Sequence, residues 1–358
     1  MAEPAGTDAA RAVVARAIGR RTFPAAVAEV GGSGGVLWRE PFGTLTFDES
    51  APPVDEDTIF DLASLTKPIV TTTLALEQLS DGVLDLREPV ATFFAEWRGV
   101  DRESATVQDL LEHSAGLAAR LIDRPPEVRR EFEHDICTMR LEYEPRTRSV
   151  YSDLGFMLLG FLLTDRRQEP LGSQFERVLP RVVPGCEALT FGVADGRRAP
   201  IAPTLPLDED VRRRGRTLTG EVHDPYAAAL GGVAGHAGLF GTAADVGAFA
   251  RATLRAARGD ASVPPPLSPD LVARATAPSV VPGSSRALGW DTMRPTSSCG
   301  GRMSPRAFGH VGFTGVSTWI DPARDRYFVL LTNRACGGGS LDDMREVRRA
   351  FHDALADR

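Results

Sequence analysis

Alternating apolar and polar positions at both ends of the chain predict β-strands. The N-terminal end opens with an amphipathic helix over Ala9–Arg20, followed by alternating runs at Phe23–Val30 and Gly35–Phe47. The glycine-rich GGSGG between these runs is typical of a tight turn, so the pair predicts a β-hairpin. A closing helix is predicted over Leu341–Leu355. Strand patterns return before it in four segments: Ala287–Asp291, Ala307–Phe313, Thr318–Asp321 and Tyr327–Thr332.

Helical patterns occupy the middle of the chain. Thr106–Leu117 predicts a capped helix that ends at Gly116. Tyr151–Leu163 begins with a polar turn and continues as an apolar run, which predicts a buried helix. A third helical run, Ile59–Leu76, follows the N-terminal hairpin and carries the strongest candidate chemistry of the chain.

The order of these elements predicts the fold class. Strands at the two ends of a chain need to share one sheet to bury their apolar faces. We therefore predict an α/β (α+β) fold in which an antiparallel sheet is flanked by helices. Residues 1–80 and 240–358 are predicted to form this sheet domain, and residues 81–239 an inserted, mostly helical domain. The functional cleft is expected between the two.

Composition excludes several classes of function. The chain has 358 residues, of which 42% are hydrophobic and 25% charged, as in ordinary globular proteins. A net charge of −7 argues against nucleic acid or an anionic membrane surface as a partner. We see no signal peptide and no stretch able to span a bilayer, and therefore expect a cytoplasmic protein. Four widely spaced cysteines fit reduced thiols, and we expect neither a metal nor a cofactor.

Ser64 and Lys67 stand three residues apart in what is predicted to be the first turns of a helix. Side chains at that spacing lie on one face of a helix. The free N–H groups at a helix start favour an oxyanion there. A serine hydroxyl is a poor nucleophile until a base takes its proton, and a desolvated lysine amine can be that base.

The use of basic residues strengthens this interpretation. Of 41 basic residues, 40 are arginine and one is Lys67. Arginine cannot be deprotonated in a protein and so cannot act as a base. Random placement would put the single lysine at this position about one time in forty. The alternative is a chance Ser-x-x-Lys in a helix, because a four-residue pattern alone is weak.

Three motifs in order give the chain a family resemblance: Ser64-Leu65-Thr66-Lys67, Tyr151-Ser152-Asp153 and His310-Val311-Gly312. The flanking sequences also match, in Leu110–Leu117, Gly231–Val246 and Leu330–Arg334. The chain resembles the serine β-lactamases and penicillin-binding proteins of the class C kind, together with their esterase and D-peptidase relatives. The resemblance extends over nearly the whole chain.

The resemblance implies roles for several residues. The tyrosine matching Tyr151 helps to deprotonate the serine, protonates the leaving group and then activates water. A phenol beside a lysine ammonium can have its pKa lowered enough for this exchange. By resemblance, the backbone amides of Ser64 and Phe313 form an oxyanion hole. GHVGFTG is predicted to be an edge strand, in which Gly312 lets the backbone approach a ligand. Without the other motifs, Tyr151 would be a tyrosine at a helix start bonded to backbone.

Two departures from the lactamase pattern bear on the substrate. Asp153 replaces the usual asparagine, and His310 replaces the usual lysine. Both changes make the place of a β-lactam carboxylate less positive, at a cost of several kcal/mol in a partly buried cleft unless a cation compensates. Arg334 is one candidate cation. We therefore predict weak turnover of penicillins and better activity on neutral acyl esters or on substrates bearing an amine. Alone, His310 would more often be a satisfied strand histidine.

Two further histidines, His223 and His236, lie in glycine-rich sequence. They either border the cleft or are loop histidines bonded to backbone, and His236 is taken as a tentative substrate-binding residue with Asp153, His310, Gly312 and Phe313. No third ligand at suitable spacing predicts a metal.

The motifs together predict a serine hydrolase that forms an acyl-enzyme on a small acyl substrate. Carboxylesterase activity ranks first, followed by D-amino-acid peptidase or amidase, acyltransferase and β-lactamase. Two alternatives without turnover remain, an acylatable sensor or binding module and a scaffold with a vestigial site. The sequence leaves the oligomeric state open.

Overall fold

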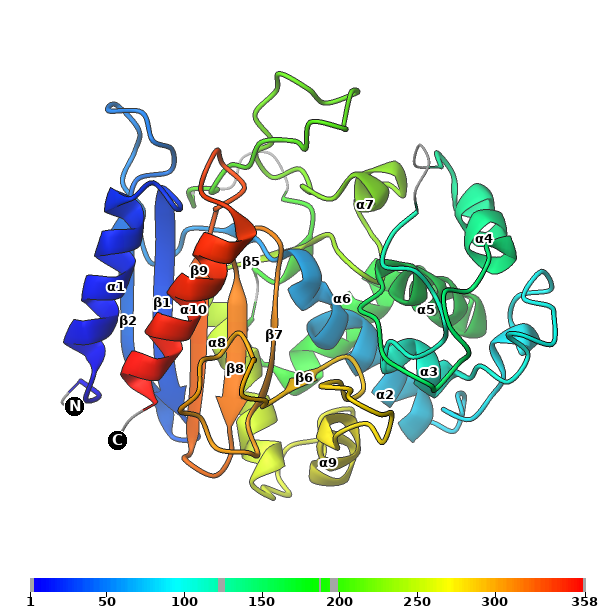
Figure 1. Cartoon of the computed structure of the whole chain (residues 1–358). Coiled ribbons are helices and arrows are strands. Elements are labelled where there is room, and N and C mark those ends of the chain that lie inside the picture. Colours follow the sequence, from blue (N-terminus) through cyan, green and yellow to red (C-terminus); the bar gives the residue numbers. More distant parts are fainter. Residues whose placement is uncertain (1–2, 122–125, 187, 194–198, 357–358) are drawn as a thin grey trace.

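An antiparallel sheet is built from the two ends of the chain (Figure 1). It is seen in a computed structural model that describes residues 3–121, 126–186, 188–193 and 199–356. Every neighbouring pair of strands in it is antiparallel. From one edge to the other, the strands are β2 (Gly35–Gly43), β1 (Ala25–Gly32), β9 (Arg326–Thr332), β8 (Ser317–Asp321), β7 (Phe308–Val311) and β6 (Asp291–Thr292). The predicted fold class and the N-terminal hairpin are confirmed.

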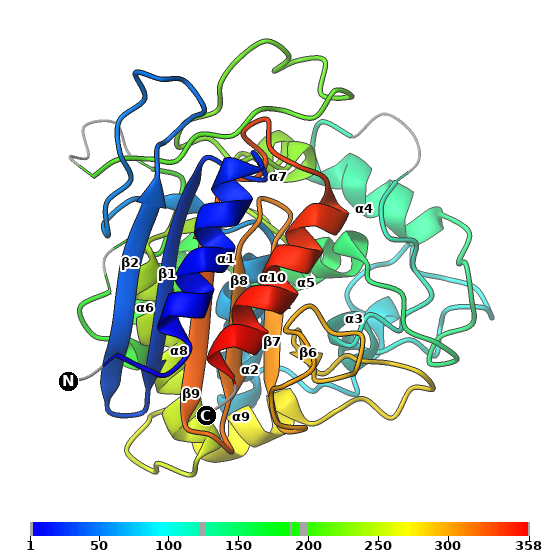
Figure 2. The same ribbon diagram turned by 60° about the vertical axis from the view of Figure 1, so that its left-hand side comes forward.

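Helices cover both faces of this sheet (Figures 1 and 2). Helices α1 (Thr7–Gly19) and α10 (Leu341–Leu355) lie side by side on one face, and α8 (Ala243–Ala257) lies on the other. Alternate residues of β1 enter the two cores, with Ala28 on the α1 side and Val27 on the α8 side. Because both faces are buried, β1 is apolar along most of its length.

The remaining helices are η1 (Ala63–Leu65), η2 (Lys67–Thr72), α2 (Thr73–Ser80), η3 (Val90–Thr92), α3 (Val107–Leu111), α4 (Arg129–Thr138), α5 (Asp153–Arg167), α6 (Leu171–Val182), α7 (Pro225–Ala229) and α9 (Pro269–Thr276). Helix α5 is buried from Asp153 to Leu163 and packs against η2, α2, α3 and α6. None of the helices in the described ranges has the length and apolar character needed to cross a bilayer.

A small second sheet joins distant segments in the order β3 (Phe60–Asp61), β5 (Leu239–Gly241) and β4 (Thr190–Phe191). The predicted boundary between residues 239 and 240 falls inside β5, which pairs with β4 from the predicted inserted domain. The division of the chain into two domains stays a prediction.

Several predicted elements differ from those observed. The helix predicted over Thr106–Leu117 is only α3, because His113 has a left-handed backbone conformation, with φ of 56°, that no helix can continue. The strand predicted over Ala287–Asp291 is wrong except for its last residue, which begins β6. GHVGFTG is not an edge strand, since β6 lies outside β7. However, β6 pairs only with Phe308 and Gly309, so His310 and Val311 have no strand paired with them on that side of β7.

Two glycines let α5 approach the segment that follows α7. A Cβ on Gly160 would lie 2.9 Å from the backbone N of Gly235, and a Cβ on Gly235 would clash with the carbonyl oxygen of Phe156. The hydroxyl of Thr71 in η2 donates to the Gly235 carbonyl at 2.6 Å. The contact therefore fixes three parts of the chain relative to one another.

We expect Gly235→Ala to lower the free energy of unfolding by about 1–3 kcal/mol, the usual range for overpacking a tight site. Urea denaturation measures the change. Gly19→Ala is the matched control, since a Cβ at Gly19, the last residue of α1, meets nothing within 4 Å. Equal stability of the Gly235 variant and the wild type would contradict the close contact.

Candidate active site

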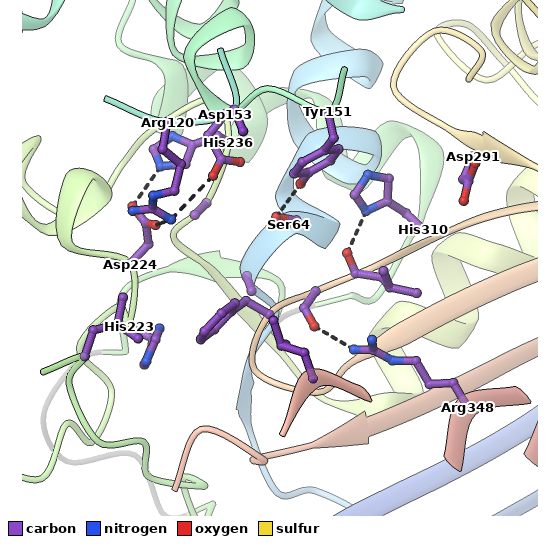
Figure 3. Close-up of a pocket in the computed structure, with 18 of the residues that line it drawn as sticks. Ser64, Arg120, Tyr151, Asp153, His223, Asp224, His236, Asp291, His310 and Arg348 are labelled. Atoms are coloured by element: carbon purple, nitrogen blue, oxygen red, sulfur yellow. Dashed lines mark hydrogen bonds and ion pairs between the residues drawn. The ribbon is translucent and has the colours of Figure 1, made fainter. Parts of the chain in front are cut away.

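A cavity of about 430 Å³ opens where α5, β7, η1 and α10 approach one another. Ser64 lies at its centre, between Tyr151 and the turn that follows β7 (Figure 3). His310 borders one side of the cavity, and Asp153 and His236 border the other. The structure thus brings together every residue that the three motifs predicted to line the site.

Ser64 is the middle residue of η1, and its position depends on the residues before it. Ala63 has a left-handed backbone conformation with φ of 45°, which is strained for a residue with a Cβ. The buried carboxylate of Asp61 holds this conformation, because Oδ1 accepts the N–H of Ala63 at 2.7 Å. The other oxygen accepts the N–H of His223 at 2.6 Å. Burial raises the pKa of Asp61 to about 6.

Lys67 is fully buried, and three oxygens surround its Nζ. Nζ donates to Ser64 Oγ at 3.0 Å, to Asp153 Oδ1 at 2.8 Å and to the His236 carbonyl at 3.0 Å. An ammonium has three N–H groups, so the site matches the charged form. Burial lowers the pKa of Lys67, but the carboxylate of Asp153 and the phenol of Tyr151 outweigh it and raise the pKa overall.

The helix that carries Lys67 is irregular. The predicted regular helix from Ser64 is instead the 3₁₀ turn η1, the π-helix η2 and then α2. Pro68 has no N–H and so cannot donate the hydrogen bond to Ser64 that a regular α-helix requires. The expected proximity of Ser64 and Lys67 nevertheless holds, as their 3.0 Å contact shows.

Tyr151 Oη lies 2.8 Å from Ser64 Oγ. The prediction that its pKa is lowered is wrong in direction. Burial raises the pKa of Tyr151 more than the ammonium of Lys67 lowers it. The phenol is therefore protonated at neutral pH.

His113, which sequence reasoning did not single out, fixes Tyr151 in place. Its ring packs on the Tyr151 ring with 4.7 Å between centroids. Its Nδ1 accepts the N–H of Ser152 and its carbonyl accepts the N–H of Val150, each at 3.0 Å. The only signal in the sequence was its place in the LLEHSAGL segment.

Charged groups alternate along the wall beside Asp153. Arg120 Nη1 lies 3.6 Å from Asp153 Oδ2 and 3.3 Å from Asp224 Oδ2. Asp224 Oδ1 lies 2.8 Å from His236 Nε2. Burial acts to raise the pKa of Asp224, but His236 and Arg120 more than offset it and hold the pKa well below its usual range. Asp224 also caps α7, which its place before Pro225 signalled, whereas nothing in the sequence signalled Arg120.

His310 is neutral in this environment. Burial, followed by the charges of Lys67 and Arg286, lowers the pKa of His310 well below its ordinary value. Nδ1 lies 2.9 Å from the Val311 carbonyl, and Nε2 has no hydrogen-bond partner among the described residues. His310 is thus only half satisfied, and its ring borders the cavity beside Tyr151.

Among the described residues, cations border the cavity together with an equal number of aspartates. Arg120, Arg286 and Arg348 all border the cavity. Arg334 does not border it and instead donates to the Phe313 carbonyl at 2.7 Å. The predicted preference for neutral acyl esters or amine-bearing substrates over penicillins therefore stays a prediction.

The turn after β7 packs directly on the Ser64 segment. A Cβ on Gly312 would lie 2.8 Å from the Leu62 carbonyl oxygen, so only glycine allows this approach. The N–H of Phe313 has no acceptor within the described part of the chain. His223 stacks on the Phe313 ring at 5.2 Å, and both His223 and His236 border the cavity. Burial lowers the pKa of His223 to about 4.

No three His, Cys, Asp or Glu side chains in the described ranges come together in a way that could hold a metal ion.

The profile of the Beta-lactamase family matches residues 10–352. The chain belongs to this family. Two curated relatives are an N-acetylmuramyl-L-alanine amidase of Bacillus subtilis and a putative D-alanyl-D-alanine carboxypeptidase of Escherichia coli. The first is 32% identical over 77% of this chain and 68% of its own length, and the second 28% over 77% and 69%.

Solved structures agree on the fold. EstCE1, a hydrolase with promiscuous acyltransferase activity, superposes with a TM-score of 0.77 over 98% of each chain at 18% identity. A class C β-lactamase from Rhodobacter sphaeroides superposes with a TM-score of 0.73 over 97% of this chain and 98% of its own at 20% identity. The chain is a Beta-lactamase-family serine hydrolase, and its relatives carry the names of several different activities.

The buried carboxylate of Asp61 predicts a pH-dependent stability. Between pH 4 and pH 6 the unfolded chain releases this proton while the folded chain keeps it, so stability falls as the pH rises. A rise in pKa from 3.8 to about 6 corresponds to about 3 kcal/mol. We expect Asp61→Asn to remove this fall, as measured by urea denaturation of both proteins at pH 4 and pH 7. Parallel pH dependence in the two proteins would contradict the assignment.

Proposed function

We propose that Ser64 is the nucleophile of an acyl-enzyme mechanism, with Lys67 and Tyr151 as the groups that control its proton. One observation carries this proposal: Ser64 Oγ lies 3.0 Å from Lys67 Nζ and 2.8 Å from Tyr151 Oη. Both distances are direct hydrogen bonds to the hydroxyl that has to lose its proton. The backbone N–H groups of Ser64 and Phe313 are the proposed oxyanion donors.

The proposed proton route passes through the phenol. Lys67 stays an ammonium, since its three N–H groups are all taken by oxygens. As Ser64 Oγ bonds to the substrate carbonyl carbon, its proton moves to the Tyr151 oxygen, and the phenol proton moves to the leaving atom. Water then attacks the acyl-enzyme by the reverse route and releases the acid. A protonated phenol, which burial favours here, is suited to this shuttle.

The proposed substrate is an amide between an acyl group and an amino acid or short peptide. A nitrogen leaves an amide only if it gains a proton, and Tyr151 is placed to supply one. Three arginines and three aspartates border the cavity, which suits a polar substrate. The two curated relatives, named as an amidase and a carboxypeptidase, support the same class of bond.

Ester hydrolysis is the second candidate. The likeness to EstCE1 extends over 98% of both chains, although at 18% identity it supports the fold more than the substrate. An alkoxide leaves without prior protonation, so the same site would need less help from Tyr151 to cleave an ester.

A substrate panel tests the proposal on the native protein and on Ser64→Ala. It comprises N-acetylmuramyl-L-alanine, D-alanine p-nitroanilide, p-nitrophenyl butyrate and a chromogenic cephalosporin. We expect sustained hydrolysis of at least one amide, and a fall of a thousandfold or more, roughly the loss that removal of a serine nucleophile causes, in the variant. A hundredfold preference for the cephalosporin would contradict amide hydrolysis. Release of one equivalent of product per protein chain, with no further turnover, would identify an acylated sensor.

Asp153→Asn tests the charge of Lys67. Removing the carboxylate removes the main group that raises the pKa of Lys67, so this pKa should fall. If the ammonium is the active form, the alkaline limb of the pH profile of kcat/KM moves to lower pH. An unchanged alkaline limb would contradict the ammonium as the active form, and an acidic limb that moves to lower pH would instead assign Lys67 as the base.

A further inference from the structure

Two buried arginines lie beneath the turn that follows β7 without a carboxylate partner. Within the described ranges, five cationic side chains are less than a tenth exposed: Lys67, Arg102, Arg213, Arg334 and Arg348. Three of them are paired, with Asp153 at 2.8 Å, Asp101 at 3.0 Å and Asp210 at 2.6 Å. Arg334 and Arg348 have no carboxylate within 4 Å in that part of the chain, and burial lowers the pKa of both.

Leaving a charge buried without a counter-ion costs several kcal/mol unless polar groups solvate it. Here the solvating groups are backbone carbonyls, three from this turn and that of Gly339, to which Arg334 Nη1 donates at 3.1 Å. Arg348 Nη2 donates to the Gly312 carbonyl at 2.6 Å and to the Val316 carbonyl at 2.9 Å. Arg334 donates twice to the Phe313 carbonyl, at 2.7 and 3.2 Å, and its guanidinium lies 4.6 Å from the centre of the Phe313 ring.

The hydrogen bond from Arg348 to the Gly312 carbonyl also affects the N–H of Phe313. The Gly312 carbonyl and the Phe313 N–H belong to the same peptide group. A charge-assisted hydrogen bond to the carbonyl oxygen draws electron density from that group and makes its N–H a stronger donor. It also fixes the plane of the peptide, while Arg334 holds the next carbonyl. Figure 3 shows Arg348 reaching this carbonyl from the side of α10, beneath the cavity.

We propose that Arg348, supported by Arg334, is a positioning residue that orients and polarises the Phe313 N–H as an oxyanion donor. The inference rests on the proposed acyl-enzyme function and adds a residue that none of the three motifs contains. The burial of two uncompensated charges is then explained, because their field is aimed at a site where negative charge develops. Burial lowers the pKa of Arg348, but a guanidinium keeps its charge at neutral pH.

Arg348→Met tests the proposal, and Arg102→Met is the matched control. Arg102 is 6% exposed, as is Arg348, and it also donates to two carbonyls, those of Cys137 and Met139, but it does not border the cavity. We expect the Arg348 variant to lose about tenfold in kcat, with KM unchanged, which is less than the loss of a whole oxyanion donor. Its affinity for phenylboronic acid, which adds to a serine oxygen as a tetrahedral anion, should fall in parallel.

Boronate affinity equal to that of the wild type, or an equal loss in the Arg102 variant, would overturn the proposal and leave the acyl-enzyme mechanism intact. If Arg348→Met does not fold, Arg348→Lys replaces it, since a buried lysine is neutral at high pH. Its kcat should then fall with rising pH more steeply than that of the wild type, and superimposable profiles would overturn the proposal.

A readout that needs no activity separates this inference from the proposed function. In protein labelled with ¹⁵N-phenylalanine, the Phe313 amide is identified by its loss in Phe313→Leu. We expect its proton resonance to move upfield in Arg348→Met, as a weaker donor should, and to stay in place in Arg102→Met. If the wild type hydrolyses nothing and Ser64 resists a fluorophosphonate, the proposed function fails, and this shift alone decides the role of Arg348.

Discussion

The site depends on one buried ammonium. Lys67 has no exposed surface, and its three N–H groups meet oxygens from Ser64, Asp153 and His236. These residues come from η1, the start of α5 and the loop before β5. The ammonium can therefore be buried only if these three segments are held in fixed positions relative to one another. The π-helix η2 and the close packing of glycines between α5 and that loop serve this same requirement.

Buried cations around the cavity are of two kinds, and the difference is one of function. Lys67 is paired with Asp153 and acts on Ser64 through a direct hydrogen bond. Arg348 and Arg334 are not neutralised by any carboxylate in the described chain, so their field extends into the cavity. In the proposed mechanism, proton control and stabilisation of negative charge are therefore supplied by separate groups.

Sequence reasoning found the residues that lie close in sequence or within motifs, and missed those that only folding brings together. Ser64 and Lys67 could be identified as a pair because they are three residues apart and because Lys67 is the single lysine of the chain. Arg120 and Arg348 come from a loop and a helix whose patterns carry no sign of the cavity. The direction of the Tyr151 pKa was wrong because it depends on burial, which no spacing reveals. The prediction that β7 is the edge strand was also wrong, because β6, which lies outside it, has only two residues and leaves no strand pattern in the sequence.

Asp153 and His310, the two departures from the lactamase pattern, are best understood as one electrostatic change. A carboxylate at residue 153 fixes Lys67 as a cation, and that charge then disfavours a second cation nearby. The charge of Lys67 is, after burial, the main reason that His310 is neutral. A lysine at residue 310 would face the same repulsion from Lys67, together with that of Arg286. Other positive charge at the cavity comes from arginines on the loop before β6 and on α10. These reach the cavity without approaching Ser64 as closely as Lys67 does.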